Sequence, residues 1–404
     1  MKIQCIEDTE KHDDSEEIVE PPEQKADSIQ NNVNVMDPIS LLKDQYRAYD
    51  IIDWHLNETL SDHHPPQLMM IIPGEGGVSK SKTIQIITEN FKQRGIVHLL
   101  VKSTYIGIAA SLIDGKTLHM AVQIPFNGRN HSWKANEKLA RFWQKRLYFI
   151  INKKLMLFCK FFTQISSALS KAKSLARVVE SDLPFGGVNV VLVGNFHQFP
   201  LVVGHPLYWL LDVMTANAKE LLGRSLYEQF KMVVCLKEQV QVIDTDWLDL
   251  LQHVCNGNCW SHHINMLHSL IITNPNCLST DFSQSPWNCA VLITPRHSVC
   301  RHWNISMSRK HCQQTNQQLF MCPAMNSIQG QPLTLAKCFS LASKMHRCNG
   351  KQGEHGGLAD SVMLSIGMNV MVIFNIETNL DVANGAQGKI VKIVMNNCEP
   401  EFSL

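Results

Sequence analysis

The sequence predicts an α/β protein built on a parallel sheet. Short apolar runs, such as residues 68–72 and 188–193, are bounded by turn residues, as buried strands are. Segments with apolar residues at helical spacing separate these runs. A glycine-rich or polar turn directly follows two of the runs. Strands that alternate with helices favour a layered α/β domain, because parallel neighbouring strands need a crossover connection.

The first part of the chain gives the clearest elements. A helix is expected over 44–56, since Tyr46, Tyr49, Ile52 and Leu56 share one face. A second helix follows the glycine-rich turn and carries Ile84, Ile87 and Phe91 on one face, a third starts from a turn at 107–111, and a fourth spans 134–146. The expected strands are 68–72, 97–101, 149–151 and 188–193.

The pattern changes after about residue 230, where we expect a helix over 247–254 and strands over 290–294, 368–374 and 389–394. Residues 340–360 are rich in glycine and are expected to form a loop. We therefore divide the chain into a tail (1–37), a first domain (38–230), and a linker with an incomplete second domain and an inserted loop region (231–404).

Charge and composition exclude several classes of protein. The net charge of +1 conceals a tail, 1–37, with 11 acidic and 3 basic residues, which we expect to be disordered. The remaining 367 residues carry 34 basic and 25 acidic side chains, a mildly basic body. No apolar run reaches the roughly 18 residues of a membrane span, and the acidic N-terminus lacks a secretory signal. The 13 cysteines are accordingly expected to be reduced thiols of a cytosolic or nuclear protein.

The turn after the first strand has the pattern of a phosphate-binding loop. It reads Gly74-Glu75-Gly76-Gly77-Val78-Ser79-Lys80-Ser81, against the pattern G-x-x-x-x-G-K-[ST]. Glycines let backbone N–H groups approach phosphates, and the following helix N-terminus favours an anion. Lys80 would reach the phosphates and Ser81 would be a ligand of Mg²⁺. The second required glycine is Ser79, whose Cβ penalises a positive φ. A functional loop and an ordinary glycine turn both remain open at this point.

A second polar cluster follows the strand at 188–193. It reads Gly194-Asn195-Phe196-His197-Gln198-Phe199-Pro200 and lies where α/β folds bind ligands, at the carboxyl end of a strand. Gln198 is a candidate to sense a γ-phosphate or an attacking water. A simple loop is the alternative interpretation.

These motifs, in this order, resemble those of the petite-integration-frequency DNA helicases, in particular the copies carried by Helitron transposons. The resemblance covers about residues 40–395 and includes an upstream glutamine, Gln45. Further segments that resemble family motifs are 103–110, 117–119, 238–242, 294–297, 367–371 and 384–388.

The resemblance implies a RecA-like P-loop NTPase domain followed by a partial second RecA-like domain. It also implies ATP and Mg²⁺ as cofactors, single-stranded or duplex DNA as partner, 5′-to-3′ unwinding, roles in DNA repair and recombination, and a nuclear location. Lys80 and Ser81 would bind phosphate and Mg²⁺, Gln45 would read adenine, and Gln198 would couple the γ-phosphate to motion. Gly74, Gly76, Gly77 and Ser79 would form the loop.

The departures from the family pattern fall on the chemistry of hydrolysis. The family's Asp-Glu pair, which holds Mg²⁺ and activates water, corresponds to Asn152-Lys153. The Asp of the second motif is Asn195, and an expected arginine is Gln241. The family's last motif is absent before Leu404. We therefore expect a degenerate, truncated helicase that hydrolyses ATP poorly or not at all.

Four other hypotheses stay open. The chain is a non-catalytic nucleic-acid-binding remnant, or a product without a folded role. In a third hypothesis, Lys153 partly replaces Mg²⁺ and holds a nucleotide without hydrolysis. In a fourth, zinc binds Cys255 and Cys259 with His262-His263, although the loop between the pairs is too short for the usual zinc spacing and scattered thiols are the favoured interpretation.

For DNA, we expect stacking aromatic side chains and a cationic helix. The aromatic candidates are Phe126, Trp133 and Trp143. The candidate cations of the helix are Lys134, Lys138, Arg141, Lys145 and Arg146. An ordinary solvated helix face is the alternative for these cations.

Overall fold

The computed structural model describes residues 37–105, 107–123, 133–176, 183–197, 204–212, 216–275, 277, 280–285, 287, 290–323, 327–328, 331–337, 339–340, 361–373, 382 and 385–394. The expected disordered tail lies almost wholly outside these residues. The chain divides into two compact units, one over Asp27–Leu278 with Val372–Ala386, and one that includes Ser279–Met371 and Gln387–Leu404. The expected division at residue 230 stays a prediction.

A six-stranded parallel sheet organises the first unit, in the order β3-β2-β4-β5-β1-β6. Its strands are β1 (Met69–Pro73), β2 (Leu100–Thr104), β3 (Lys116–Thr117), β4 (Tyr148–Asn152), β5 (Asn189–Gly194) and β6 (Met232–Val233). Its helices are α1 (Lys43–Leu60), α2 (Lys80–Gln93), α3 (Gly107–Ser111), α4 (Leu118–Val122), α5 (Trp133–Gln144), α6 (Cys159–Leu175), α7 (Ala218–Glu228), α8 (Thr245–Asn256) and α9 (Ser261–Ser269). Short 3-10 turns, η1 to η4, lie at Pro38–Ser40, Val97–Leu99, Lys154–Met156 and Pro184–Gly187.

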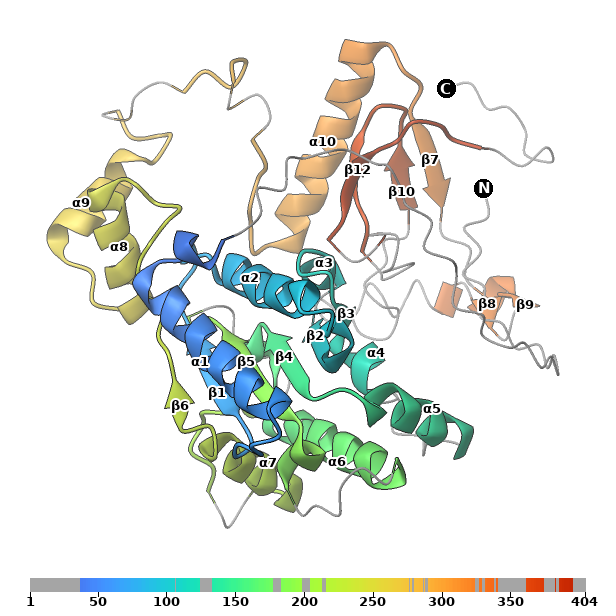
Figure 1. Ribbon diagram of the computed structural model, residues 1–404. Coiled ribbons are helices and arrows are strands. Elements are labelled where there is room, and N and C mark those ends of the chain that lie inside the picture. Colours follow the sequence, from blue (N-terminus) through green and yellow to red (C-terminus); the bar gives the residue numbers. More distant parts are fainter. Residues whose placement is uncertain are drawn as a thin grey trace. The chain divides into compact units, whose positions relative to one another are not determined.

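Helices cover both faces of this sheet (Figure 1). Alternate residues of β1 show this, because Met70 and Ile72 pack with α1 and α2, whereas Ile71 packs in the cluster that contains α5, α6 and α7 residues. Because both faces are buried, the strands are continuous apolar runs rather than alternating ones. This is why β1, β4 and β5 are visible in the sequence, and the predicted α/β fold with a parallel sheet is confirmed.

The described residues of the second unit form one long helix and paired short strands. The helix is α10 (His297–Thr315). The strands pair antiparallel as β7 (Phe320–Pro323) with β10 (Ser361–Leu364), β8 (Ser327–Ile328) with β9 (Gln331–Pro332), and β11 (Asn369–Met371) with β12 (Gln387–Lys389). Most of the loop expected over 340–360 lies outside the described residues. No helix in the described part of the chain is long and apolar enough to cross a membrane.

Three expected strands need correction. Residues 97–99 form a 3-10 turn, and β2 starts at Leu100, where pairing with Tyr148 begins. Residues 290–294 form no strand, because no described segment pairs with this apolar run and Ile293 is 93% exposed. The strand expected over 389–394 ends at Lys389, where its ladder with β11 ends.

Candidate phosphate-binding site at the edge of the sheet

The loop between β1 and α2 has the backbone that a phosphate-binding loop requires. Gly77 has φ +88°, and Ser79, the N-cap of α2, lies in the left-handed region at φ 53°, ψ 41°. A non-glycine residue pays a steric cost in this region, as the sequence predicts for Ser79. Gly74 is tightly enclosed, since a Cβ there would lie 2.6 Å from Val78. The loop therefore keeps its shape despite the lost glycine.

Lys80 folds back onto the loop that precedes it. Its Nζ donates to the carbonyl oxygens of Gly74 at 3.0 Å and Glu75 at 2.6 Å. Burial lowers the pKa of the Lys80 ammonium, and the negative charge of Glu75 partly opposes this effect. An incoming phosphate would take the place of the two carbonyls around the amine. Ser81 follows on α2 and is exposed, so its hydroxyl is accessible to a ligand.

Gln45 connects α1 to the same loop. It is 3% exposed, and its Nε2 donates to the carbonyl oxygen of Val78 at 3.1 Å. Its Oε1 accepts from the backbone N–H of Leu42 at 3.2 Å. The side chain thus holds the loop in place from behind, and the expected contact with adenine stays a prediction.

A segment after β6 lies directly over the glycines. The Nε2 of Gln239 donates to the carbonyl oxygen of Gly76 at 2.7 Å, and the backbone N–H of Val240 donates to that of Gly77 at 3.1 Å. A Cβ on Gly77 would lie 1.9 Å from Gln239 Oε1. Residues 238–242 resemble a family motif, but the resemblance does not predict this contact with the loop. Gln241, in the place of the expected arginine, is exposed and donates its backbone N–H to Gln239 at 3.3 Å.

The ends of β4 and β5 bring the other predicted residues to this edge. The backbone N–H of Gly74 donates to the carbonyl oxygen of Gly194 at 3.0 Å, which joins the loop to the end of β5. Asn152 ends β4, is 8% exposed, and accepts from the backbone N–H of Lys153 at 2.8 Å. Asn195 follows β5 and accepts from the backbone N–H of His197 at 2.9 Å. The side-chain oxygens of Asn152 and Asn195 therefore both accept hydrogen bonds within local turns.

The remaining predicted residues of this edge are Lys153 and Gln198. Lys153 has a left-handed backbone, φ 60°, and partial burial lowers the pKa of its ammonium. Gln198 lies outside the described residues, so its predicted role stays a prediction.

The donor set at this edge does not fit Mg²⁺. The ion prefers carboxylate and other oxygen ligands in octahedral geometry. Among the described residues that directly follow β1, β4 and β5, Glu75 is the one carboxylate, and its Oε1 lies 3.9 Å from His197 Nδ1. Asn152 offers a neutral oxygen and Lys153 a cation beside it. The site fits an anion through Lys80, the loop N–H groups and the α2 N-terminus, and we derive no step through a metal ion.

Sequence reasoning missed a buried lysine beside this edge. Lys154 is 3% exposed, and its Nζ has no hydrogen-bond partner among the described residues. It lies 3.5 Å from the ring centroid of Phe196 and lines a small hollow with Leu207, Tyr208 and Tyr227. Burial lowers its pKa to about 7, with a small opposing effect of Cys235. A lysine that follows two polar residues gives no sequence signal of burial.

The expected DNA-stacking residues are partly wrong. Trp143 is fully buried and donates its Nε1–H to the carbonyl oxygen of Ala121 at 3.0 Å, so it cannot stack on a base. Phe126 and the side chains of Trp133 and Lys134 lie outside the described residues. Arg146 packs on the ring of Phe142, 3.8 Å from its centroid. The exposed cations of this region are Lys138, Arg141 and Lys145.

Comparison with known proteins agrees with this arrangement. The family model of the PIF1-like helicases matches residues 40–260, more than half of the chain. The ATP-dependent DNA helicase PIF1 of Candida albicans is 24% identical over 333 residues, which are 80% of this chain and 32% of that protein. The chain thus spans about a third of the length of this relative.

Two solved structures share the fold. The crystal structure of Pif1 helicase from Candida albicans has a TM-score of 0.54 at 20% identity, over 89% of this chain and 70% of that one. That of Pif1 from Bacteroides in complex with ADP-AlF3 and single-stranded DNA has a TM-score of 0.50 at 15% identity, over 85% and 70%. With the loop, the strand-end motifs and the parallel sheet in place, the chain belongs to the PIF1-like helicase family.

Proposed function

We propose that this chain binds the phosphates of ATP at the β1–α2 loop and hydrolyses ATP poorly or not at all. One observation carries the proposal: the loop keeps Lys80 and its anion-binding backbone, while Asn152 and Lys153 stand at the end of β4, where the family pattern has its acidic pair. The ADP-AlF3 complex of the Bacteroides relative supports a nucleotide as the ligand.

The expected loss of hydrolysis follows from the chemistry of the missing groups. Removal of a general base typically costs about 10²- to 10⁴-fold in rate. An arginine at the transferred phosphate supplies about 10³- to 10⁵-fold in related reactions, and Gln241 carries no charge to replace it. Lys153, if protonated, cannot accept a proton from water. Hydrolysis is therefore expected to be slower by several orders of magnitude than in a relative with an acidic pair.

Lys153 gives the proposal a further consequence. A cation at the end of β4 would attract phosphate oxygens and repel Mg²⁺. Nucleotide binding is then expected to be independent of Mg²⁺, because the positive charge of Lys153 offsets part of the phosphate charge that the metal ion would otherwise neutralise. This is the hypothesis of a nucleotide held without hydrolysis.

Thermal unfolding with and without ATP tests the proposal. ATP should raise the melting temperature of the chain, and the increment should persist in EDTA. Lys80→Ala should abolish the increment. Lys82→Ala is the matched control, because this half-buried lysine of α2 donates to Ser40 O at 3.3 Å and not to the loop. An increment that disappears in EDTA, or that survives Lys80→Ala, would contradict the proposal.

The second candidate function is nucleic-acid binding without catalysis. It rests on the three exposed cations of α5 and its C-terminal end, Lys138, Arg141 and Lys145. Among solved relatives, Bacteroides Pif1 is bound to single-stranded DNA, and two coordinating Pif1 helicases unwind DNA at a forked duplex. We propose single-stranded DNA as the partner, held by phosphate contacts. Salt-dependent binding to single-stranded DNA without ATP turnover would favour this function over the motor. DNA repair, recombination, a transposon origin and a nuclear location remain proposals that follow from the family resemblance.

A further inference from the structure

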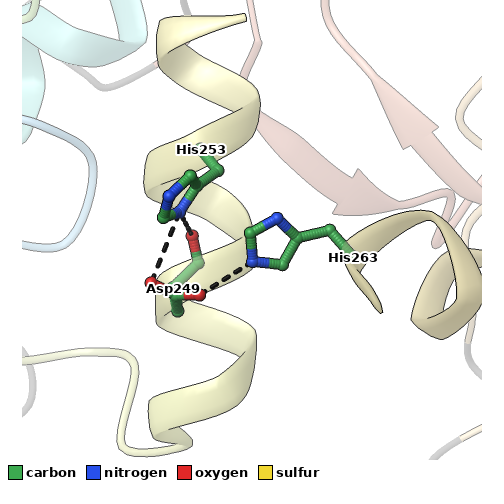
Figure 2. A group of neighbouring side chains, drawn as sticks. All are labelled: Asp249, His253 and His263. Carbon is green, nitrogen blue, oxygen red and sulfur yellow. Dashed lines mark hydrogen bonds and ion pairs between the residues drawn. The ribbon is translucent and has the colours of Figure 1, made fainter. Parts of the chain in front are cut away.

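A cluster of imidazoles and a carboxylate joins α8 to α9, outside the phosphate-binding site. Asp249 and His253 lie one turn apart on α8, so both side chains project from the same side of that helix (Figure 2). The chain then turns at Gly257, φ +69°, and α9 returns His263 to the same place. The side chain of His263 is 1% exposed, whereas that of Asp249 is 49% exposed.

The potential ligand atoms are close together. His263 Nε2 lies 2.7 Å from Asp249 Oδ2, and His253 Nδ1 lies 3.3 Å from Asp249 Oδ1. One ligand atom from each of these three residues can be chosen so that all lie within 4.8 Å of one another. A fourth group, His262 Nε2, lies 3.7 Å from Asp249 Oδ2 and is accessible to solvent.

These spacings are near those of a tetrahedral metal site. Bonds of about 2.0–2.1 Å to nitrogen and oxygen place tetrahedral ligands about 3.3 Å apart. Measured to the Asp249 carboxylate, the His253 distance already has this value and the His263 and His262 distances differ from it by about 0.4–0.6 Å. The widest spacing in the cluster is at most 4.8 Å, so side-chain rotations must draw the ligand atoms together around an ion. Imidazole with one carboxylate is a ligand set for zinc and similar transition metals rather than for Mg²⁺ or Ca²⁺.

We propose that Asp249, His253 and His263, with His262 as the fourth ligand, bind a divalent transition metal ion of the zinc class. The ion would fasten α9 to α8, and nothing in the nucleotide site depends on it. This ligand set differs from the cysteine site considered from the sequence. Cys255 and Cys259 are exposed free thiols, and neither belongs to the cluster. The helical repeat brings in Asp249 and His253, which a search for cysteine pairs does not detect.

A bound metal ion would have to replace hydrogen bonds that the histidines of the cluster already make. The backbone N–H of Trp260 donates to His263 Nδ1 at 3.1 Å, which leaves the ring proton on Nε2, toward Asp249. Metal binding at Nε2 would move that proton to Nδ1 and release the Trp260 N–H. Trp260 is 61% exposed, so water can replace the lost partner. Binding through His253 Nδ1 would likewise give up its bond of 2.9 Å to the Asp249 carbonyl. With the bond of 2.7 Å between His263 Nε2 and Asp249 Oδ2, three hydrogen bonds are given up in exchange for three or four metal–ligand bonds.

Metal titration of the full chain tests the site. The chelator-stripped, reduced protein is titrated with Zn²⁺ in competition with a chromogenic chelator, and with Co²⁺ by visible absorption. The variants are Asp249→Asn, which keeps an acceptor for His263, and His253→Gln. The matched control is His268→Gln, an exposed histidine of α9 outside the cluster. A Cys255→Ser/Cys259→Ser variant tests the thiols, and melting curves without metal show whether each variant is folded.

The expected result is one Zn²⁺ per chain, bound at least about tenfold more weakly in Asp249→Asn and in His253→Gln. The affinity should be unchanged in His268→Gln and in Cys255→Ser/Cys259→Ser. The Co²⁺ complex should show visible ligand-field bands without near-ultraviolet thiolate bands. Absence of binding, wild-type affinity in Asp249→Asn and His253→Gln, or loss of binding with the cysteines would overturn the proposal. None of these outcomes depends on ATP.

Discussion

Replacing the buried Lys154 by methionine should stabilise the protein at neutral pH. Lys154 is 3% exposed, without a hydrogen-bond partner among the described residues, and its pKa is lowered from 10.5 to about 7. At about 1.36 kcal/mol for each unit of pKa, the lowering of the Lys154 pKa corresponds to a penalty of about 5 kcal/mol on the charged form. The ring of Phe196, 3.5 Å away, returns about 1–2 kcal/mol by a cation–π interaction. The net penalty at pH 7 is then about 3–4 kcal/mol, which methionine, similar in length and uncharged, would remove.

The sign of the pH dependence follows from the lowered pKa. Between about pH 7 and 10.5, the unfolded chain keeps the proton on Lys154 and the folded chain does not. The unfolded state binds more protons there, so stability rises with pH in this window, and the full penalty of the buried charge is present below it. Because methionine does not titrate, the advantage of Lys154→Met should shrink from about 3–4 kcal/mol at pH 7 to about 1 kcal/mol at pH 10.

Urea unfolding of the wild type and Lys154→Met at pH 7 and pH 10 measures this difference. Comparison at each pH cancels the titration of the many thiols. Lys160→Met, an exposed lysine near the start of α6, is the matched control and should show no such pH-dependent gain. Equal stability of the wild type and Lys154→Met at pH 7, or a gain of the same size at both pH values, would refute the reasoning.

Three further predictions concern the loop, the core and the cationic helix. Ser79→Gly should stabilise the chain by up to about 1 kcal/mol, because glycine adopts the left-handed backbone of this position without strain. It should also raise the ATP-dependent increment in melting temperature. A loss of stability would contradict this prediction. Gly223→Ala should lower the free energy of unfolding by about 2–3 kcal/mol in urea, because the added Cβ would lie 2.0 Å from a backbone oxygen of α6. An unchanged free energy of unfolding would show that α7 can move away from α6. Neutralisation of the exposed cations near α5, by Lys138→Gln, Arg141→Gln and Lys145→Gln together, should weaken the salt dependence of single-stranded DNA binding. The slope of log K against log salt concentration, measured by fluorescence anisotropy, should decrease in magnitude by about 2. An unchanged slope would place the DNA elsewhere.

The fold of the first unit was largely predictable from local pattern. Strands buried on both faces, such as β1 and β5, are continuous apolar runs with turn residues after them. The run 290–294 has the same composition but no partner, and pairing is a long-range property that a local pattern does not contain. Trp143 shows the same limit, because an aromatic residue among cations can face DNA or the core, and only packing decides.

The candidate site was predictable where motif spacing fixes the backbone. Ser79 occupies the left-handed position that its place in the loop requires. Contacts from distant segments were not predictable: Gln239 meets the loop from 163 residues away in sequence, and Lys154 is buried by side chains of three different segments. His263 joins Asp249 only because α9 folds back on α8.

Phosphate release from ATP, with and without single-stranded DNA, tests most directly whether this family member has lost its hydrolytic chemistry. The proteins compared are the wild type, Lys80→Ala, and an Asn152→Asp/Lys153→Glu variant that restores the acidic pair. We predict that the wild type releases phosphate no faster than Lys80→Ala, with or without DNA. DNA-stimulated release by the wild type that Lys80→Ala abolishes would contradict the prediction and would show that the chain hydrolyses ATP without the acidic pair.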